Sequence, residues 1–500
     1  RTEGKEPYEW QLDAAEAFQL GLHCTVLAGT GAGKTLPFIM PAFVNPCNVY
    51  IVISPLNALE EDQACRFQRL GLNAVAINGE TWSPKLQKEL QDVIYQIIVT
   101  SPEMCIQHSA FRDLIQSATY AKHIGGIIID EAHCISQWGD KFRPEYSNLI
   151  SLRSLVPLGV PIYATTATAP PLVLEDIRRN LGIEGNKSFH LNLGDDCPNI
   201  ASKVQYMKSA NDFDALWFLA EGVRTTDELQ RGIVFTNSIL HSQITCREFW
   251  KMISPELHGQ VAFLHSKRFA QSRAKVLELY HKGQIKILFA MECGGMGMDI
   301  PDVEFVVQFG VLSSLSIWMQ HAGHAGRSPH LEATAILLVE KSVLQRVGRA
   351  RKQQKETKYR KAVEDGLRQW IETEGCCHDV MDKYFNNPSP RKCPVFHCCN
   401  NCNPVGESTV VSAQRPSTPI QTPHHTSPPC TPSSTTNAAG KRPMAQDVGA
   451  VARRAGQHLQ DVWQALEHWH IQTHRRDYPH CSFTATTIML DHMLTTLASN

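Results

Sequence analysis

The sequence predicts an α/β fold in which doubly wound parallel sheets form two lobes, followed by a small helical subdomain and a disordered linker. Short apolar runs rich in β-branched residues, such as residues 127–129, are typical of strands buried on both faces of a parallel sheet. That run ends in two adjacent carboxylates, Asp130 and Glu131. Another run, residues 23–28, leads into a glycine-rich turn. Both features follow strands at their carboxyl ends, where open α/β sheets bind their ligands.

The glycine-rich turn, AGTGAGKT at residues 28–35, has the pattern of a phosphate-binding loop, with Ala28 in place of the first glycine. Glycines let backbone N–H groups approach phosphates closely, and the helix that follows adds the positive end of its dipole. In such a loop Lys34 reaches the outer phosphates of ATP, and the Thr35 hydroxyl binds Mg²⁺. A chance turn is the alternative, but the strand with two acids later in the chain favours the nucleotide site. The expected ATP-binding residues of the loop are Thr30, Gly31, Ala32, Gly33, Lys34 and Thr35.

The two acids predict the chemistry of nucleotide hydrolysis. Asp130 can hold Mg²⁺, directly or through water, and Glu131 can orient the attacking water. Aromatic and basic side chains alternate directly downstream. Because such a mixture stacks on bases and pairs with phosphates, we expect nucleic-acid contacts from Trp138, Phe142 and Arg143.

The run DEAHCISQWGDKFRPEY, residues 130–146, resembles the RecQ family of superfamily-two DNA helicases, and further motifs agree over residues 7–402. The resemblance implies two RecA-like lobes with ATP between them. It also implies 3′-to-5′ movement on single-stranded DNA and unwinding of branched or duplex DNA in repair or recombination. It assigns adenine recognition to Gln11, whose amide offers a donor and an acceptor. Motifs similar to the family's strand-contacting segments assign DNA contacts to Ser54, Pro55, Thr100 and His265, and catalysis falls to Lys34, Asp130, Glu131 and Arg327.

The motifs of the second lobe resemble the family with one departure. Asp299 would face the ribose and the lobe interface, and Gln320 and His324 would lie near the nucleotide in QHAGHAGR. Arg327 would be the arginine finger, which stabilises charge on the transferring phosphoryl group. The family usually carries a second arginine where this chain has His324, and histidine is mostly neutral at physiological pH. Three interpretations are open: a slow or altered motor, sequence drift in a degenerate copy of the helicase, and a motor in which Arg327 alone is sufficient.

The overall composition limits the class of protein. Lys and Arg number 48 against 49 Asp and Glu, a net charge of −1, so any electrostatic grip on DNA must be local. The polar start RTEGKEPYEW shows no signal peptide, and no apolar stretch approaches the ~18 residues of a membrane span. Because the chain starts at Arg1 rather than at methionine, we expect a fragment. We expect no membrane partner and, in a eukaryote, a nuclear location, whereas nothing indicates protein partners.

Sixteen cysteines without secretory features indicate reduced thiols, some of them bound to metal. Four thiolates suit a closed tetrahedral structural zinc site. The resemblance to the family favours zinc over free thiols, although neighbouring residues 377, 378, 397 and 398 crowd the site, so that ligand identity could shift by a residue. The expected zinc ligands are Cys376, Cys393, Cys399 and Cys402.

The expected domain order follows from these motifs and from a change in composition after the last cysteine. Residues 404–440 are dense in Ser, Thr and Pro, which is typical of a disordered linker. Two other functions stay open: a helicase-derived DNA-binding or scaffold protein with weakened catalysis, and an RNA helicase. The expected domains are an ATP-binding lobe at 1–193, a second lobe at 200–340, a helical zinc-binding subdomain at 341–403, the linker at 404–450 and a short helical tail at 451–500.

Overall fold

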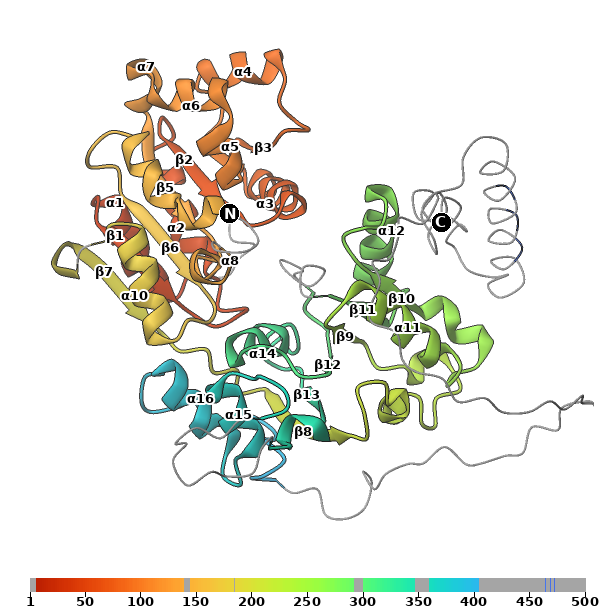
Figure 1. Ribbon diagram of the computed structural model, residues 1–500. Helices are drawn as coiled ribbons and strands as arrows, with labels where there is room; N and C mark the ends of the chain where they lie inside the picture. The colour runs from red at the N-terminus through yellow and green to blue at the C-terminus, as the bar shows by residue number, and fades with distance from the viewer. Residues whose placement is uncertain are drawn as a thin grey trace, which may run out of the picture.

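The structure, a computed structural model, contains two parallel-sheet lobes joined through residues 193–199, as Figure 1 shows. It describes residues 6–138, 144–183, 185–291, 300–346 and 359–403, together with Gln464, His468 and Gln472. The expected linker at 404–450 and nearly all of the tail at 451–500 lie outside these residues. None of the described helices is long and apolar enough to cross a bilayer.

The first lobe is built on a seven-stranded parallel sheet in the described part of the chain, in the order β3-β4-β2-β5-β6-β1-β7. Its central strands are apolar and fully buried because helices cover both faces of the sheet. The strands are β1 (His23–Leu27), β2 (Val49–Ile53), β3 (Ala74–Ile77), β4 (Ile97–Thr100), β5 (Ile124–Ile129), β6 (Ile162–Thr166) and β7 (Ser188–Asn192).

The helices of the first lobe begin close to the carboxyl ends of strands, as in other doubly wound sheets. Serine caps explain two of the starts: Ser83 and Ser101 each accept a backbone N–H and precede a proline at the first helical position. The helices are α1 (Glu9–Gln19), α2 (Thr35–Val44), α3 (Asn57–Arg69), α4 (Pro84–Gln91), α5 (Pro102–Gln107), α6 (Ser109–Gln116), α7 (Ala118–Ala121), α8 (Cys134–Trp138), α9 (Pro144–Ser147) and α10 (Pro171–Asn180), with 3-10 turns at Leu149–Ser154 and Gly185–Lys187.

The second lobe has a six-stranded parallel sheet in its described part, in the order β10-β11-β9-β12-β13-β8. The strands are β8 (Ile200–Met207), β9 (Gly232–Thr236), β10 (Val261–Leu264), β11 (Ile287–Ala290), β12 (Phe305–Phe309) and β13 (Ala333–Glu340). The helices are α11 (Ile239–Trp250), α12 (Ala270–His281) and α14 (Leu315–Ala322), with 3-10 turns at Phe213–Leu219, Thr226–Glu228, Pro255–Gln260 and Lys341–Leu344.

Two further helices, α15 (Asp365–Glu372) and α16 (Cys377–Phe385), pack on the second lobe and share its hydrophobic core. Trp370 of α15 lies with its ring 5.6 Å from that of Trp318 in α14, and both side chains are fully buried. Backbone pairing of Cys399 with Ser202 attaches the end of the segment to β8. The helical subdomain is therefore continuous with the second lobe, and it also reaches the segment that joins the lobes.

Candidate nucleotide, metal and nucleic-acid sites

The phosphate-loop pattern forms the turn between β1 and α2. Gly31 and Gly33 have φ angles of +81° and +82°, a left-handed conformation that explains glycine at both positions. Lys34 bends back over the loop, where its Nζ donates to the carbonyl oxygens of Ala28 at 2.9 Å and Gly29 at 3.1 Å. Burial lowers the pKa of Lys34, and the carboxylates of Glu131 and Asp130 oppose that shift. The amine thus lies among the residues that would face the outer phosphates.

Gln11, which we expected to read adenine, holds the phosphate loop in this structure. Its side chain is 3% exposed, and its Nε2 donates to the carbonyl oxygen of Gly33 at 3.0 Å. A Cβ added at Gly33 would lie 2.6 Å from that nitrogen, so the glycine also makes room for the amide. The Gln11 Oε1 accepts the backbone N–H of Tyr8 at 2.9 Å. The structure thus gives the amide a role in fixing the loop, and adenine recognition by Gln11 stays a prediction.

The two acids lie directly beyond the carboxyl end of β5. Burial, followed by the charge of Glu131, raises the pKa of Asp130 to about 6. Its carboxylate accepts bonds from Gln63 Nε2 at 2.7 Å and from the Glu131 N–H at 3.0 Å. Glu131 has a φ of +48°, which is rare for a residue with a side chain and marks strain of the kind found at functional sites. Burial also raises the pKa of Glu131, against the nearby cations Lys34 and Arg327.

His133, the histidine of the DEAH run, connects the acids to the next strand. Its Nδ1 lies 2.9 Å from Thr166 Oγ1 and 3.4 Å from a carboxylate oxygen of Glu131. Burial lowers the pKa of His133 to about 4, so the ring is neutral. The Thr166 hydroxyl donates onward to the Thr168 carbonyl oxygen, which places the histidine in a chain of hydrogen bonds that extends beyond β6.

The second lobe brings QHAGHAGR against the phosphate loop. A Cβ added at Gly323 would lie 2.8 Å from Thr30 Oγ1, so only glycine allows this approach. His324 is 7% exposed, and its Nδ1 accepts from Arg327 Nη2 at 3.2 Å. Burial and then the charge of Arg327 hold the pKa of His324 well below its usual range, so the ring stays neutral. Gln320 contacts His133 rather than the phosphate loop.

The DNA-binding residues taken from the resemblance are buried in this structure. Ser54 and Thr100 are both 0% exposed, and Thr100 donates its hydroxyl to the Ile77 carbonyl oxygen at 2.7 Å. Pro55 is buried beside Ser54. His265 is 4% exposed and neutral, because burial lowers its pKa to about 4, and Gln243 donates to its ring at 2.8 Å. In the described conformation each of these side chains lies in the interior beside its strand, and their contacts with DNA stay predictions.

Four expected site residues lie outside what the structure describes. Asp299, Phe142 and Arg143 fall in undescribed segments, and the Trp138 side chain is also outside the described part. Their roles at the nucleotide and at DNA stay predictions.

The cysteine site forms with one ligand changed from our expectation. The Sγ atoms of Cys376, Cys398, Cys399 and Cys402 all lie within 4.8 Å of one another. Cys393 is exposed and outside this group. The reason is the path of the chain: the Val395 N–H bonds to the Pro198 carbonyl oxygen and the Cys398 carbonyl oxygen accepts from Ser202, so the strand-like segment along β8 starts after Cys393.

The donor sets fit the groups that the resemblance implies. Four converging thiols suit zinc, and backbone N–H groups at Cys377, Cys402 and Asn401 bring the pKa of Cys399 to about 7 although burial acts to raise it. Thr35 begins α2 directly after Lys34, and Asp130 is close enough to interact electrostatically with that lysine. A hydroxyl and a carboxylate beside a lysine are the oxygen ligands and the counter-charge that a magnesium–ATP complex requires.

Comparison with known proteins identifies the same two lobes. The model of the DEAD/DEAH box helicase family matches residues 8–177, and that of the helicase conserved C-terminal domain matches residues 215–329. The chain is 29% identical over 393 residues to an ATP-dependent DNA helicase RecQ of Haemophilus influenzae, covering 77% of this chain and 58% of that protein. It is 30% identical over 319 residues to a putative ATP-dependent DNA helicase Q1 of Caenorhabditis elegans, covering 62% of this chain and 48% of that protein. The chain thus spans about half the length of these relatives.

Solved structures share the fold. The DUF1998 helicase MrfA bound to DNA superimposes with a TM-score of 0.55 at 18% identity, over 68% of this chain and 50% of that chain. The S. cerevisiae Dbp5 bound to RNA and ADP BeF3 gives a TM-score of 0.54 at 18% identity, over 68% of this chain and 85% of that chain. The chain thus carries the two helicase domains that the family models describe, one in each lobe, and it resembles RecQ-type DNA helicases.

Proposed function

We propose that this protein is an ATP-dependent DNA helicase that moves 3′ to 5′ along single-stranded DNA and unwinds branched or duplex DNA in repair or recombination. The observation that carries the proposal is that charged groups from both lobes meet at one site. The pKa of Glu131 responds to Lys34 from the phosphate loop and to Arg327 from the second lobe. A site that needs both lobes can couple hydrolysis to their relative movement.

The residues have separable roles in this proposal. Lys34 and Arg327 hold the outer phosphates from opposite sides, while Glu131 accepts the proton of the attacking water. Burial raises the pKa of Glu131, and the charges of Lys34 and Arg327 oppose that shift. Thr35 and Asp130 would hold Mg²⁺, which would supply positive charge beside the phosphates. When hydrolysis removes the outer phosphate, the bridge between the two cations is lost and the lobes can separate.

The same proposal includes a structural zinc and a DNA-binding surface. The four gathered thiols would hold a structural zinc, which would contribute folding free energy to the helical subdomain. Trp138, Phe142 and Arg143 are the proposed strand contacts, supported by their aromatic and basic character. A nuclear location in a eukaryotic cell stays a prediction, which a fluorescent fusion would check.

Strand displacement tests the proposal and its direction. Two duplexes of identical sequence carry a single-stranded tail at either the 3′ or the 5′ end. With ATP and Mg²⁺, the proposal expects release of the strand only from the 3′-tailed duplex, and no release by Glu131→Gln. Release from the 5′-tailed duplex alone would overturn the polarity. Hydrolysis stimulated by DNA without release from either duplex would indicate a translocase that does not unwind.

A further inference from the structure

The segment that joins the lobes lies directly on the phosphate loop. The Gly29 N–H donates to the Gly194 carbonyl oxygen at 3.0 Å, and the Leu193 N–H donates to the Leu27 carbonyl oxygen at 2.8 Å. A Cβ added at Gly29 would lie 3.5 Å from the Asp195 backbone. The joining segment thus pairs with the end of β1 and sets the position of Gly29, the second residue of the loop.

The other side of the same segment is held by the helical subdomain. The Asn387 Nδ2 donates to Asp195 Oδ1 at 2.7 Å, and the Asp195 N–H donates back to Asn387 Oδ1 at 3.4 Å. Asn192 Nδ2 donates to the Asn386 carbonyl oxygen at 3.3 Å. These bonds join residues about 190 positions apart in the chain, so they form only when the subdomain is docked.

Asn387 is itself fixed by the end of α16. Asn386 caps the helix with a left-handed φ of +53°, and the Asn387 N–H donates to the Asp382 carbonyl oxygen at 3.0 Å. The same side-chain nitrogen that reaches Asp195 also donates to Asp382 Oδ1 at 3.1 Å. Cys376 caps the other end of this helix and is one of the four gathered cysteines.

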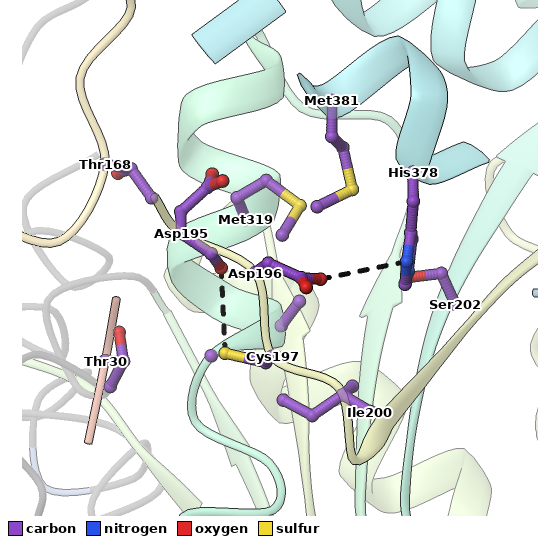
Figure 2. A pocket seen from close by; sticks show the side chains of 12 residues that line it. Thr30, Thr168, Asp195, Asp196, Cys197, Ile200, Ser202, Met319, His378 and Met381 are labelled. Carbon is purple, nitrogen blue, oxygen red and sulfur yellow. Dashed lines mark hydrogen bonds and ion pairs between the residues drawn. The ribbon is translucent and has the colours of Figure 1, made fainter. Parts of the chain in front are cut away.

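The phosphate loop, the joining segment and α16 all line one cavity. Figure 2 shows Thr30 of the phosphate loop, Asp195 and Asp196 of the joining segment, and His378 of α16 around one cavity. Asp195 is 3% exposed, and its Oδ2 has no hydrogen-bond partner among the described residues. Asn387 therefore supplies the side-chain hydrogen bond that holds a buried carboxyl beside the loop.

We propose that Asn387 is a positioning residue for the phosphate loop: through Asp195 it fixes the joining segment, and through Gly194 and Gly29 it sets the loop for ATP. The inference rests on the proposed function for its effect on ATP, but the positioning of Gly29 does not require catalysis. Ordering the loop before ATP arrives removes part of the entropy cost of binding, so loss of the latch weakens ATP binding more than it slows chemistry.

The test compares Asn387→Ala with two matched variants of the full chain. Tyr384→Phe removes a hydrogen bond from the same helix to Glu364 without touching the joining segment. Asp195→Asn keeps an oxygen that accepts from Asn387. Zinc content and thermal unfolding are measured for each, so that a general loss of folding is recognised. Two readouts follow: hydrogen exchange at the Gly29 amide without nucleotide, and the KM and kcat of ATP hydrolysis.

Asn387→Ala is expected to speed exchange at Gly29 and to raise the KM for ATP roughly 3- to 10-fold, the range for the loss of one ordinary hydrogen bond, while kcat changes less than about 2-fold. Tyr384→Phe and Asp195→Asn should resemble the parent in both readouts. Exchange at Gly29 that is as slow in Asn387→Ala as in Tyr384→Phe would overturn the latch, whether or not the parent hydrolyses ATP. A parent without ATPase activity but with faster exchange in Asn387→Ala would reject the proposed function and keep the latch.

Discussion

The side-chain amide of Gln320 in the second lobe donates a hydrogen bond to Nε2 of His133 in the first lobe, across 2.9 Å. Both residues are buried, and the bond fixes the tautomer of His133, since an Nε2 that accepts leaves the proton on Nδ1, facing Thr166. The lobe interface is thereby joined to Glu131, which lies 3.4 Å from that Nδ1. A movement between the lobes that breaks this bond would change the hydrogen bonding of His133 and thereby the surroundings of the Glu131 carboxylate.

Removing the amide should therefore uncouple the lobes. Gln320→Ala leaves the buried His133 Nε2 without this donor, and an unsatisfied buried polar group costs about 1–3 kcal/mol of free energy. If that cost falls on the closed, active arrangement, the kcat of ATP hydrolysis should fall about 10- to 100-fold. The KM for ATP should change little, because the phosphate loop is not touched. Gln345→Ala, at an exposed glutamine, is the control. Equal rates for the two variants would show that the bond does not contribute to turnover.

His324→Arg should increase turnover and decrease stability in the absence of nucleotide. The neutral His324 accepts a hydrogen bond from Arg327. An arginine at position 324 has no acceptor, so without nucleotide its guanidinium would lie beside that of Arg327 and repel it. With ATP bound, the phosphate oxygens would accept hydrogen bonds from both guanidinium groups, and the added positive charge would stabilise the transferring phosphoryl group. We therefore expect kcat to rise on the order of tenfold. His330→Arg, at an exposed histidine, is the matched control for added charge. An unchanged kcat would mean that position 324 does not reach the phosphates.

The cysteine geometry predicts about one zinc per chain, bound by the ligand set observed rather than the one expected from spacing. Cys398→Ser should lower the zinc content measured by atomic absorption and lower the midpoint of thermal unfolding, because zinc binding contributes folding free energy. Cys393→Ser should keep both, since this thiol is exposed outside the group. The reverse pattern would restore Cys393 as the ligand.

Asp195 predicts a particular pH dependence of stability. Burial, with smaller contributions from Asp196 and Asp382, raises the pKa of Asp195 from 3.8 to about 7, although Asn387 acts to lower it. Because the folded state binds the proton more tightly than the unfolded chain, this carboxyl stabilises the fold at low pH and the contribution is lost as pH rises through about 7. The side chain at position 195 does not titrate in Asp195→Asn. The thermal unfolding midpoint of this variant, relative to that of the parent, should therefore rise between about pH 5 and about pH 8. A constant difference between the two midpoints over that range would contradict the raised pKa.

The sequence predicted features that depend on backbone conformation or on a neighbouring strand. It did not predict the direction in which individual side chains point. The phosphate loop was predictable because glycines at 31 and 33 are required by their left-handed backbone. The position of Asp130 and Glu131 followed from the buried strand before them. Ser54 directly follows β2 and Thr100 ends β4, but their positions in the sequence did not reveal that their side chains are buried.

Other features depend on contacts between distant segments. Cys398 replaces Cys393 because backbone bonds to Pro198 and Ser202 set the path of the segment, and no local pattern indicates them. The amide of Gln11 can bond to adenine or to a carbonyl oxygen, and only the fold reveals its bond to Gly33. The contact of Asn387 with Asp195 joins two polar residues that lie outside the recognised motifs.

Release of phosphate from ATP, with and without single-stranded DNA, tests the central claim most directly. We predict slow release by the parent protein alone and an increase of at least about tenfold on adding single-stranded DNA, because strand binding favours the arrangement in which both lobes complete the site. Glu131→Gln should bind ATP and release no phosphate in either condition, whereas Lys34→Ala should bind ATP weakly. DNA binding by the parent without any phosphate release would contradict the account and indicate a helicase-derived scaffold whose QHAGHAGR motif no longer supports hydrolysis.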